Sequence, residues 1–481
     1  MDVLLTNGKR IPIEMHKVRV VQKTRLTPVE GRLQAIEEGG YNTFLLRTRD
    51  IFLDMLTDSG TNAMSDNQLA AMMVSDDAYA GGESYYKLGE AVKDVLGFQY
   101  YVPVHQGRAA EHLLGKIFVS PGQVVPMNYH FTTTKAHFEM AGAKVLEIYT
   151  DEALNTSSSA PFKGNLDLEK FEEVIKKYGA DKVAFVRMEA TTNLIGGQPF
   201  SLENLKAVRK IAVKHNIPVV VDCSLISENA YFIKRREPEY KDTTIDQVVK
   251  DMMAQADLIY LSGRKSTCVR GGLIATNDPK YFDQLKAWLP VYEGFITYGG
   301  MSSKEIEAMA VGLREMTDLD VASSSPDLIQ HFVDSMVERG IPAVTPPGGL
   351  AGHVDAMRFL PHVPQAQYPA GALAAALYLV SGARGMERGT ISMDRDEHGN
   401  DVYADMELLR LAVPRRVYSA AHMDYVVDRL AWLFEHRNLV GGLSFVEEPP
   451  VLRFFTGRLQ AVGNWGHKLA EAYKADFGNG G

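Results

Sequence analysis

The segment Ala256-Asp-Leu-Ile-Tyr-Leu-Ser-Gly-Arg-Lys-Ser266 decides the interpretation of the fold. It begins as an apolar strand and continues into a turn that carries Lys265. Upstream, a second apolar strand, Ile217-Pro-Val-Val-Val221, ends on Asp222. Because such runs alternate with helical patterns such as residues 202–215, they indicate βαβ units. The sequence therefore predicts an α/β fold with a mostly parallel sheet.

The combination of Asp222 and Lys265 points to one cofactor, pyridoxal phosphate (PLP). A lysine amine must form a Schiff base with the cofactor aldehyde, and a buried carboxylate must keep the pyridine nitrogen protonated. Taken alone, Lys265 fits a solvated side chain and Asp222 fits a helix cap. Their order, and their position at the ends of two strands, favours PLP.

Length and composition limit the other possibilities. A chain of 481 residues is too long for one simple core, so two domains are expected. The net charge of -9 argues against nucleic acid or an anionic membrane as the main partner. The N-terminal sequence lacks a signal-peptide pattern, and the longest apolar run, residues 370–380, is too short to span a bilayer. We therefore expect a cytoplasmic protein.

The cysteines point to packing rather than chemistry. Cys223 and Cys268 are too few for a disulfide framework or a metal cluster. Both lie beside the proposed cofactor residues, so we expect them to be small buried side chains.

The rest of the chain extends the α/β pattern at both ends. Strands are also expected at residues 183–187, 356–359 and 407–413, and helices at residues 109–118, 303–316, 326–339 and 420–435. This layout predicts a large cofactor domain and a smaller α+β domain assembled from both termini. We assign residues 57–315 to the large domain, and residues 1–56 and 316–481 to the small one.

A glycine-bearing loop before the helix at residues 109–118 offers a phosphate site. A helix N-terminus presents backbone N–H groups and the positive end of its dipole to an anion. Gln106 can add a side-chain donor and Arg108 a charge. Ser262, just before Lys265, is well placed to give a hydroxyl to the same phosphate. Arg264 is either a second cation at this site or a solvated side chain.

Further motifs follow one another along the chain. They are Tyr41-Asn-Thr-Phe-Leu-Leu46, Leu56-Thr-Asp-Ser-Gly-Thr-Asn-Ala-Met-Ser65, Asp77-Ala-Tyr-Ala-Gly81, Pro103-Val-His-Gln-Gly-Arg108, Phe131-Thr-Thr-Thr134, Asn193, Gly196-Gly-Gln-Pro199, Glu228-Asn-Ala-Tyr-Phe-Ile-Lys234, Thr297-Tyr-Gly-Gly300, Met386-Glu-Arg-Gly389, Arg410-Leu-Ala-Val-Pro-Arg415, His422-Met-Asp424 and Leu452-Arg-Phe-Phe-Thr456. In this order they resemble the tryptophanase and tyrosine phenol-lyase family of β-eliminating lyases.

The resemblance implies a PLP enzyme of fold type I, similar to aspartate aminotransferase. It implies a homotetramer with potassium near the active site. The implied reaction cleaves a β-substituted L-amino acid to pyruvate, ammonia and a released group.

The resemblance also assigns the cofactor site. Lys265 is the Schiff-base lysine and then the base that takes the α-proton, and Asp222 holds the pyridine nitrogen. Phe131 stacks on the ring, which suits an aromatic face. The full set of implied cofactor-binding residues is Gln106, Gly107, Arg108, Phe131, Asn193, Asp222, Ser262, Arg264 and Lys265.

Substrate residues are implied in the same way. Arg410 pairs with the substrate carboxylate. Tyr79, supplied by the neighbouring subunit, is the general acid that protonates the leaving carbon, and Thr132 belongs to the catalytic set. Without the resemblance, Tyr79 fits a packed rim residue and Arg410 a structural ion pair. The implied substrate-binding residues are Thr57, Ser59, Arg388, Arg410, Phe454 and Phe455.

Two of these positions favour phenol release over indole release. Arg388 matches an arginine used near the phenol hydroxyl in the phenol-releasing branch, although a surface ion pair is its alternative. Phe454 matches an aromatic wall where the indole-releasing branch has a histidine.

Three positions depart from the family pattern. Leu225 stands where the family has an arginine that hydrogen-bonds the cofactor's phenolate oxygen, a contact of about 1.5–3 kcal/mol. Arg264 stands where a lysine is usual. The acidic residue of the implied cation site is the shorter Asp77, and the other implied ligands are the carbonyls of Gly60 and Arg270.

Leu225 keeps three hypotheses open. The first is a β-eliminating lyase most like the phenol-releasing branch. The second is a diverged PLP enzyme that cleaves a C–S bond, substitutes at the β-carbon or transaminates, with weak tyrosine cleavage. The third is a non-catalytic binding protein, and retention of Lys265, Asp222, Arg410 and Tyr79 argues against it.

Overall fold

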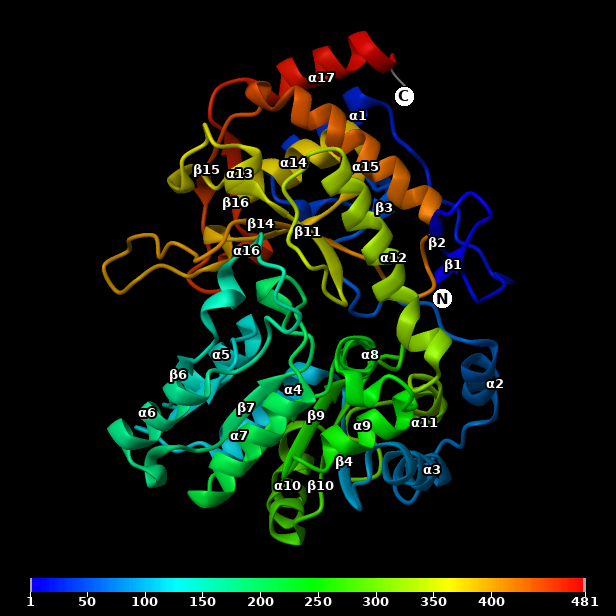
Figure 1. Ribbon diagram of the computed structural model, residues 1–481, viewed down its shortest axis with the longest axis vertical. Coiled ribbons are helices and arrows are strands. Elements are labelled where there is room, and N and C mark those ends of the chain that lie inside the picture. Colours follow the sequence, from blue (N-terminus) through cyan, green and yellow to red (C-terminus); the bar gives the residue numbers. More distant parts are fainter. Residues whose placement is uncertain (1, 479–481) are drawn as a thin grey trace.

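The computed structural model describes residues 2–478, which form two bodies (Figure 1). The larger body, in the lower half of the view, contains a seven-stranded sheet. The smaller body, in the upper half, combines N-terminal elements in blue with C-terminal elements in yellow, orange and red. The predicted α/β class is confirmed. The domain boundaries at residues 56 and 315 stay a prediction.

The central sheet has the strand order β4-β10-β9-β8-β7-β5-β6. Strand β10 runs antiparallel to β4 and β9, and the other neighbours pair in parallel. Strands β7 and β8 bring Glu189 and Asp222 side by side in register. The strands are β4 (Tyr100–Val104), β5 (Val124–Met127), β6 (Lys144–Glu147), β7 (Val186–Glu189), β8 (Val219–Asp222), β9 (Leu258–Ser262) and β10 (Gly272–Thr276).

Helices surround this sheet (Figure 1). The turn after β4 leads directly into α4, so the N-terminus of α4 lies at the carboxyl end of that strand. The helices of the larger body are α2 (Asp66–Val74), α3 (Glu83–Ala91), α4 (Gly107–Phe118), α5 (Thr132–Met140), α6 (Leu168–Tyr178), α7 (Leu202–Lys214), α8 (Ile226–Arg236), α9 (Ile245–Met253), α10 (Pro279–Tyr292) and α11 (Ser303–Glu315), and α12 (Leu319–Glu338) leads to the smaller body.

The smaller body packs both ends of the chain into one apolar core. Its central helix, α14 (Pro369–Ser381), is apolar all round and buried along its whole length. Pro369 suits the first helical position, and Gly382, with φ of 70°, ends the helix in the left-handed conformation that glycine adopts readily. This helix is the apolar run noted in the sequence. Across residues 2–478, the structure contains no helix with the length and apolar character needed to cross a bilayer.

Strand β3 pairs with β12, which ties the N-terminal part to the C-terminal part. The remaining elements are β1 (Asp2–Leu4), β2 (Arg10–Pro12), α1 (Val29–Glu38), β3 (Leu53–Asp54), β11 (Ala351–Asp355), α13 (Ala356–Phe359), β12 (Ala383–Arg384), β13 (Met386–Arg388), β14 (Leu408–Ala412), α15 (Ala420–Glu435), β15 (Leu443–Glu447), α16 (Arg453–Thr456), β16 (Arg458–Ala461) and α17 (Trp465–Phe477).

Two expected elements are wrong. Residues 356–359 form the short helix α13 rather than a strand, because the Asp355 carboxylate accepts the backbone N–H of Arg358 and caps a helical turn. The helix expected from residue 326 begins earlier, at Leu319, and includes Pro326 in its interior. The expectation for both cysteines is confirmed, since each is a buried free thiol.

Candidate active site

A cavity of about 410 Å³ is lined by residues of both bodies. Its larger-body side is formed by the carboxyl ends of β7, β8 and β9 and the N-termini of α4 and α5, the usual location of a ligand site in such sheets. The predicted site residues that line it are Thr57, Ser59, Gln106, Gly107, Arg108, Phe131, Thr132, Asn193, Asp222, Ser262, Arg264, Lys265, Arg388, Arg410, Phe454 and Phe455.

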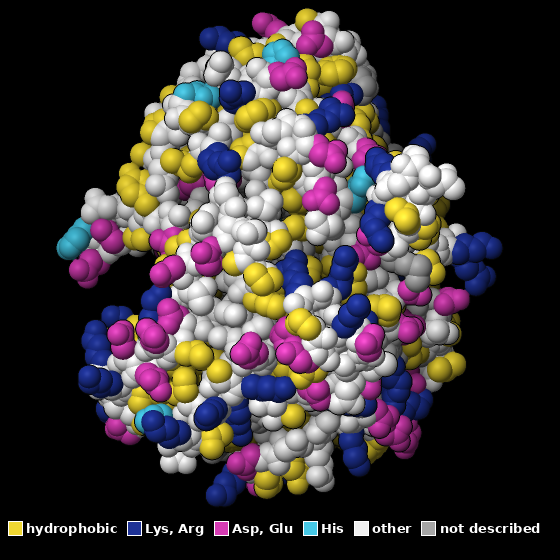
Figure 2. Space-filling model, in the orientation of Figure 1, with side chains coloured by type: hydrophobic (Ala, Val, Ile, Leu, Met, Phe, Trp, Pro, Cys, Tyr) yellow, Lys and Arg dark blue, Asp and Glu magenta, His cyan; other side chains and the backbone are white. Residues whose placement is uncertain are grey.

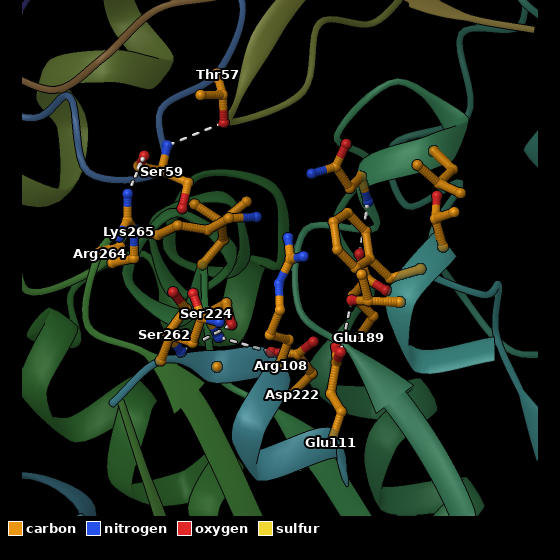
Figure 3. A pocket seen from close by; sticks show the side chains of 18 of the residues that line it. Thr57, Ser59, Arg108, Glu111, Glu189, Asp222, Ser224, Ser262, Arg264 and Lys265 are labelled. Carbon is orange, nitrogen blue, oxygen red and sulfur yellow. Dashed lines mark hydrogen bonds between the residues drawn. The ribbon is translucent and has the colours of Figure 1, made fainter. Parts of the chain in front are cut away.

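Lys265 lies beside Arg264, below the segment with Thr57 and Ser59 and above Ser224 and Ser262 (Figure 3). Its Nζ atom is 5.2 Å from the centre of the Phe131 ring. Phe131 is the residue before α5, so its ring faces the cavity beside the lysine. An amine next to an aromatic face fits an aldehyde-bearing ring that both binds the lysine and stacks on Phe131.

The Asp222 carboxylate lies at the end of β8 and is buried. The backbone N–H of Ser224 donates to its Oδ1 atom over 2.9 Å, and the Arg187 guanidinium donates to its Oδ2 atom over 2.7 Å. These contacts hold the carboxylate in one orientation at the cavity floor. A fixed, buried carboxylate is the group that a pyridinium nitrogen requires.

The N-terminus of α4 forms the other end of the floor. A Cβ atom on Gly107 would lie 2.8 Å from the Cβ atom of Ser262, so only glycine permits this close approach. The backbone N–H of Ser262 donates to the Ser224 hydroxyl over 3.0 Å. The free helix N–H groups, the hydroxyls and the nearby Arg108 match a phosphate group.

Arg264 adds to the positive charge of this end. Burial, and then the cations Arg270 and Arg108, lower the pKa of the Arg264 guanidinium. A bound phosphate dianion would relieve this repulsion. The residues present therefore fit PLP.

Two arginines of the smaller body approach the cavity with unfilled donors. Arg410 donates to the Asn193 side-chain oxygen and to the Leu56 carbonyl, each over 2.8 Å, while its Nε is buried and has no partner in the described part of the chain. The Nε and Nη1 atoms of Arg388 are also buried, and neither has a partner among residues 2–478. Burial, and then the neighbouring Arg388, lower the pKa of Arg410 to about 10. Unfilled buried donors indicate a site for ligand oxygens.

Aromatic rings form the wall beside these arginines. The Phe454 and Phe455 ring centres are 4.0 Å apart, and Phe44 meets them edge-on at 5.5 Å and 5.2 Å. Such a wall suits an aromatic side chain of the ligand.

Leu225 gives the cavity an apolar surface where the resemblance implies an arginine. Its side chain is buried and belongs to a small apolar cluster with Leu350, Ala351 and Ala412. The departure noted in the sequence is therefore accommodated by packing.

Four predicted site residues lie outside this cavity. Tyr79 is 74% exposed, and its ring packs against Phe295 and Tyr298 in a separate hollow that Asp77 also lines. Gly60 and Arg270 line neither hollow. Within one chain, Tyr79 and Asp77 therefore line a hollow other than the one that contains Lys265, while Gly60 donates its backbone N–H to the carbonyl of Arg264, next to Lys265. In the described part of the chain, no group of three or more His, Cys, Asp or Glu residues could hold a metal.

The sequence interpretation missed three buried charged residues at or beneath the cavity floor. Arg187 and Glu189 are buried on β7, and Glu189 lines the cavity. Glu111 is buried as well and accepts hydrogen bonds from Thr133 and Thr134. The signal was available, because charged residues at positions i and i+2 of a central apolar strand share one face and require partners.

Comparison with known proteins gives the same assignment as the geometry. Residues 54–429 match the family described as Beta-eliminating lyase. The chain is 46% identical over 451 residues to a tyrosine phenol-lyase of Symbiobacterium thermophilum, covering 93% of this chain and 98% of that protein. It is 44% identical over 454 residues to a tyrosine phenol-lyase of Pasteurella multocida, covering 94% and 99%.

Among solved structures, the fold is similar to that of the serine palmitoyltransferase of Sphingomonas wittichii. The TM-score is 0.57 at 13% sequence identity, over 81% of this chain and 88% of that one. At this identity the similarity concerns the fold alone.

Proposed function

The chain belongs to the β-eliminating lyases, PLP-dependent enzymes of fold type I, and we propose that it cleaves L-tyrosine to phenol, pyruvate and ammonia. One observation carries the proposal. The cavity that contains Lys265 and Asp222 also receives Arg388 and Arg410, and each of these arginines has at least one buried N–H donor without a partner among residues 2–478. When bound, the cofactor withdraws electrons from the substrate's α-carbon, so that its proton becomes acidic and the bond from Cβ to the leaving group can break.

Arg410 binds the α-carboxylate of the amino acid, because a guanidinium offers two parallel donors to a carboxylate. Thr57 and Ser59 line the same part of the cavity and add hydroxyl groups. With the substrate held there, Lys265 takes the α-proton as the general base.

Arg388 and Thr132 receive the hydroxyl of the leaving group, and the wall of Phe44, Phe454 and Phe455 packs against its ring. The leaving carbon needs a proton, and we assign the role of proton donor to Tyr79 of a second copy of the chain. The exposure of Tyr79 supports this role, since an exposed ring is free to enter another subunit's cavity.

The diverged-enzyme hypothesis is not favoured. The relatives that cover most of the chain are tyrosine phenol-lyases, and Leu225 packs in an apolar cluster with Leu350, Ala351 and Ala412. C–S bond cleavage is retained as the second candidate, because the aromatic wall would also accept an S-alkyl group.

Several properties implied by the resemblance are proposed with this function. They are a homotetramer, a potassium site that uses Gly60, Asp77 and Arg270, a cytoplasmic location, and domain boundaries at residues 56 and 315. Acidic and basic side chains are interspersed on the face drawn in Figure 2, as expected for an enzyme of small molecules rather than a nucleic-acid-binding protein.

Product analysis tests the function. PLP-loaded protein should release equal amounts of phenol and pyruvate from L-tyrosine, and Lys265→Ala should release neither. Pyruvate from S-methyl-L-cysteine without any phenol from L-tyrosine would instead support the second candidate.

A further inference from the structure

Arg187 lies beneath the cavity floor and is entirely buried. Its Nη2 atom donates to the Asp222 carboxylate over 2.7 Å and to the Glu189 carboxylate over 3.0 Å. Its Nε donates to the Tyr260 hydroxyl over 2.9 Å and its Nη1 to the Tyr129 carbonyl over 3.2 Å. Arg187 does not line the cavity, so it acts only through its neighbours.

Both oxygens of the Glu189 side chain accept hydrogen bonds, as expected for a carboxylate. One accepts a hydrogen bond from the Arg187 guanidinium, and the other accepts one from the backbone N–H of Asn193 over 2.9 Å. Its side chain lines the cavity next to Asp222, in register on the adjacent strand. Two carboxylates share one guanidinium, which leaves one net negative charge at the floor.

We propose that Arg187 is a positioning residue that joins Asp222 and Glu189 into one anionic unit, and that Glu189 is a second carboxylate facing the cofactor ring. Arg187 fixes the orientation of Asp222, and Glu189 balances the charge of Arg187. Without Glu189, the guanidinium would cancel the charge that Asp222 presents to the pyridinium nitrogen. The proposal rests on the cofactor and not on the choice of substrate.

Neighbouring groups act on the pKa of both Glu189 and Arg187. Burial, and then the Asp222 carboxylate, raise the pKa of Glu189, while Arg187 opposes the rise. Burial alone would lower the pKa of Arg187, but Tyr260, Glu189 and Asp222 together raise it well above its usual range. Glu111 from α4, Lys265, and Arg388 from the smaller body are other charged groups that face the unit.

The test uses the absorption band of the bound cofactor, whose change with pH reports the protonation of its linkage to Lys265. A nearby negative charge favours the protonated, cationic form. Glu189→Gln should therefore move the midpoint to lower pH by about one unit. Arg187→Met should move it to higher pH and weaken PLP binding by about tenfold or more.

A matched control separates charge from folding. Glu228→Gln removes another buried carboxylate that is paired with an arginine, Arg415, but does not line the cavity. It should lower the thermal unfolding midpoint without moving the absorption midpoint. Shifts of the same sign in Glu189→Gln and Arg187→Met, or no shift in either while PLP stays bound, would overturn the proposal. Failure of tyrosine cleavage alone would leave these spectral shifts in place.

Discussion

Arg187 and Arg388 are both buried on strands beside the active-site cavity, and each has a glutamate close by in sequence. Only Arg187 forms an ion pair with its neighbouring glutamate. Arg187 and Glu189 are separated by two positions and share a strand face, so they form an ion pair. Glu387 and Arg388 are adjacent and point to opposite faces. Glu387 accepts the Ser392 hydroxyl and the backbone N–H of Ile391 instead.

This difference in pairing indicates that the two bodies have different roles in binding. In the larger body, the Arg187, Glu189 and Asp222 end of the floor pairs its charges internally and keeps a fixed anion for the cofactor. The smaller body leaves donors of Arg388 and Arg410 open, which suits groups that arrive with the substrate. Paired groups are preorganised, whereas unpaired groups are stabilised only when a ligand fills them.

The largest effect is expected on the floor. Lys265→Ala should lower elimination by about 10²- to 10⁴-fold with every substrate, because the general base is lost. It should also abolish the visible band of the cofactor–lysine linkage. Absorption spectra and pyruvate release measure both, with the exposed Lys280→Ala as the control. A retained band would mean that another amine binds the cofactor.

On the open side, Arg410→Met removes the partner of the substrate carboxylate. Loss of such a charged pair costs about 2–5 kcal/mol, so kcat/KM should fall by at least about 30-fold. Tyrosine and S-methylcysteine should suffer equally, because both carry the α-carboxylate. Steady-state kinetics with the two substrates test this expectation, and a loss confined to tyrosine would assign Arg410 to the leaving group.

The buried Glu387, which is not paired with Arg388, should make the stability of the protein depend on pH. Burial, and then Glu407, raise the pKa of Glu387 to about 7 from an ordinary value of 4.5. The pKa of Glu387 is higher in the folded protein than in the unfolded chain, so the folded state is favoured while Glu387 is neutral. This contribution to the free energy of unfolding is complete below about pH 4.5 and is lost as the pH rises through about 7. The shift corresponds to about 3 kcal/mol.

Glu387→Gln cannot ionise and should therefore lose less stability than the wild type between acid and neutral pH. Urea unfolding of the cofactor-free protein at several pH values measures the difference. Parallel curves for the two proteins would show that Glu387 is already ionised and paired in the folded state.

Much of this architecture could be predicted from sequence. Helix α15 was expected with its observed bounds, because its apolar positions recur at helical spacing. The strand ends at Asp222 and near Lys265 placed both groups at one edge of a parallel sheet, and the cavity confirms that they meet. The strand predicted at residues 356–359 is wrong, because the cap at Asp355 favours a helical turn and the apolar pattern is too short to distinguish a strand from a helix.

The contact between Arg187 and Asp222 could not be predicted from sequence in the same way. Arg187 reaches Asp222 across neighbouring strands, so the contact depends on strand order and register. The proposed role of Tyr79 requires a second chain, which the sequence of one chain does not position. The contacts of Arg187 are set by tertiary geometry rather than by local pattern.

We propose that the paired charges of the larger body serve the cofactor and that the unpaired donors of the smaller body serve the substrate. The most direct test of this difference is the substrate preference of Arg388→Met. Leaving-group recognition through Arg388 predicts that kcat/KM for L-tyrosine falls about tenfold more than kcat/KM for S-methyl-L-cysteine, which has no hydroxyl on its leaving group. The cofactor spectrum should stay unchanged, since the floor is intact. An equal loss with both substrates would contradict the account and make Arg388 a structural residue.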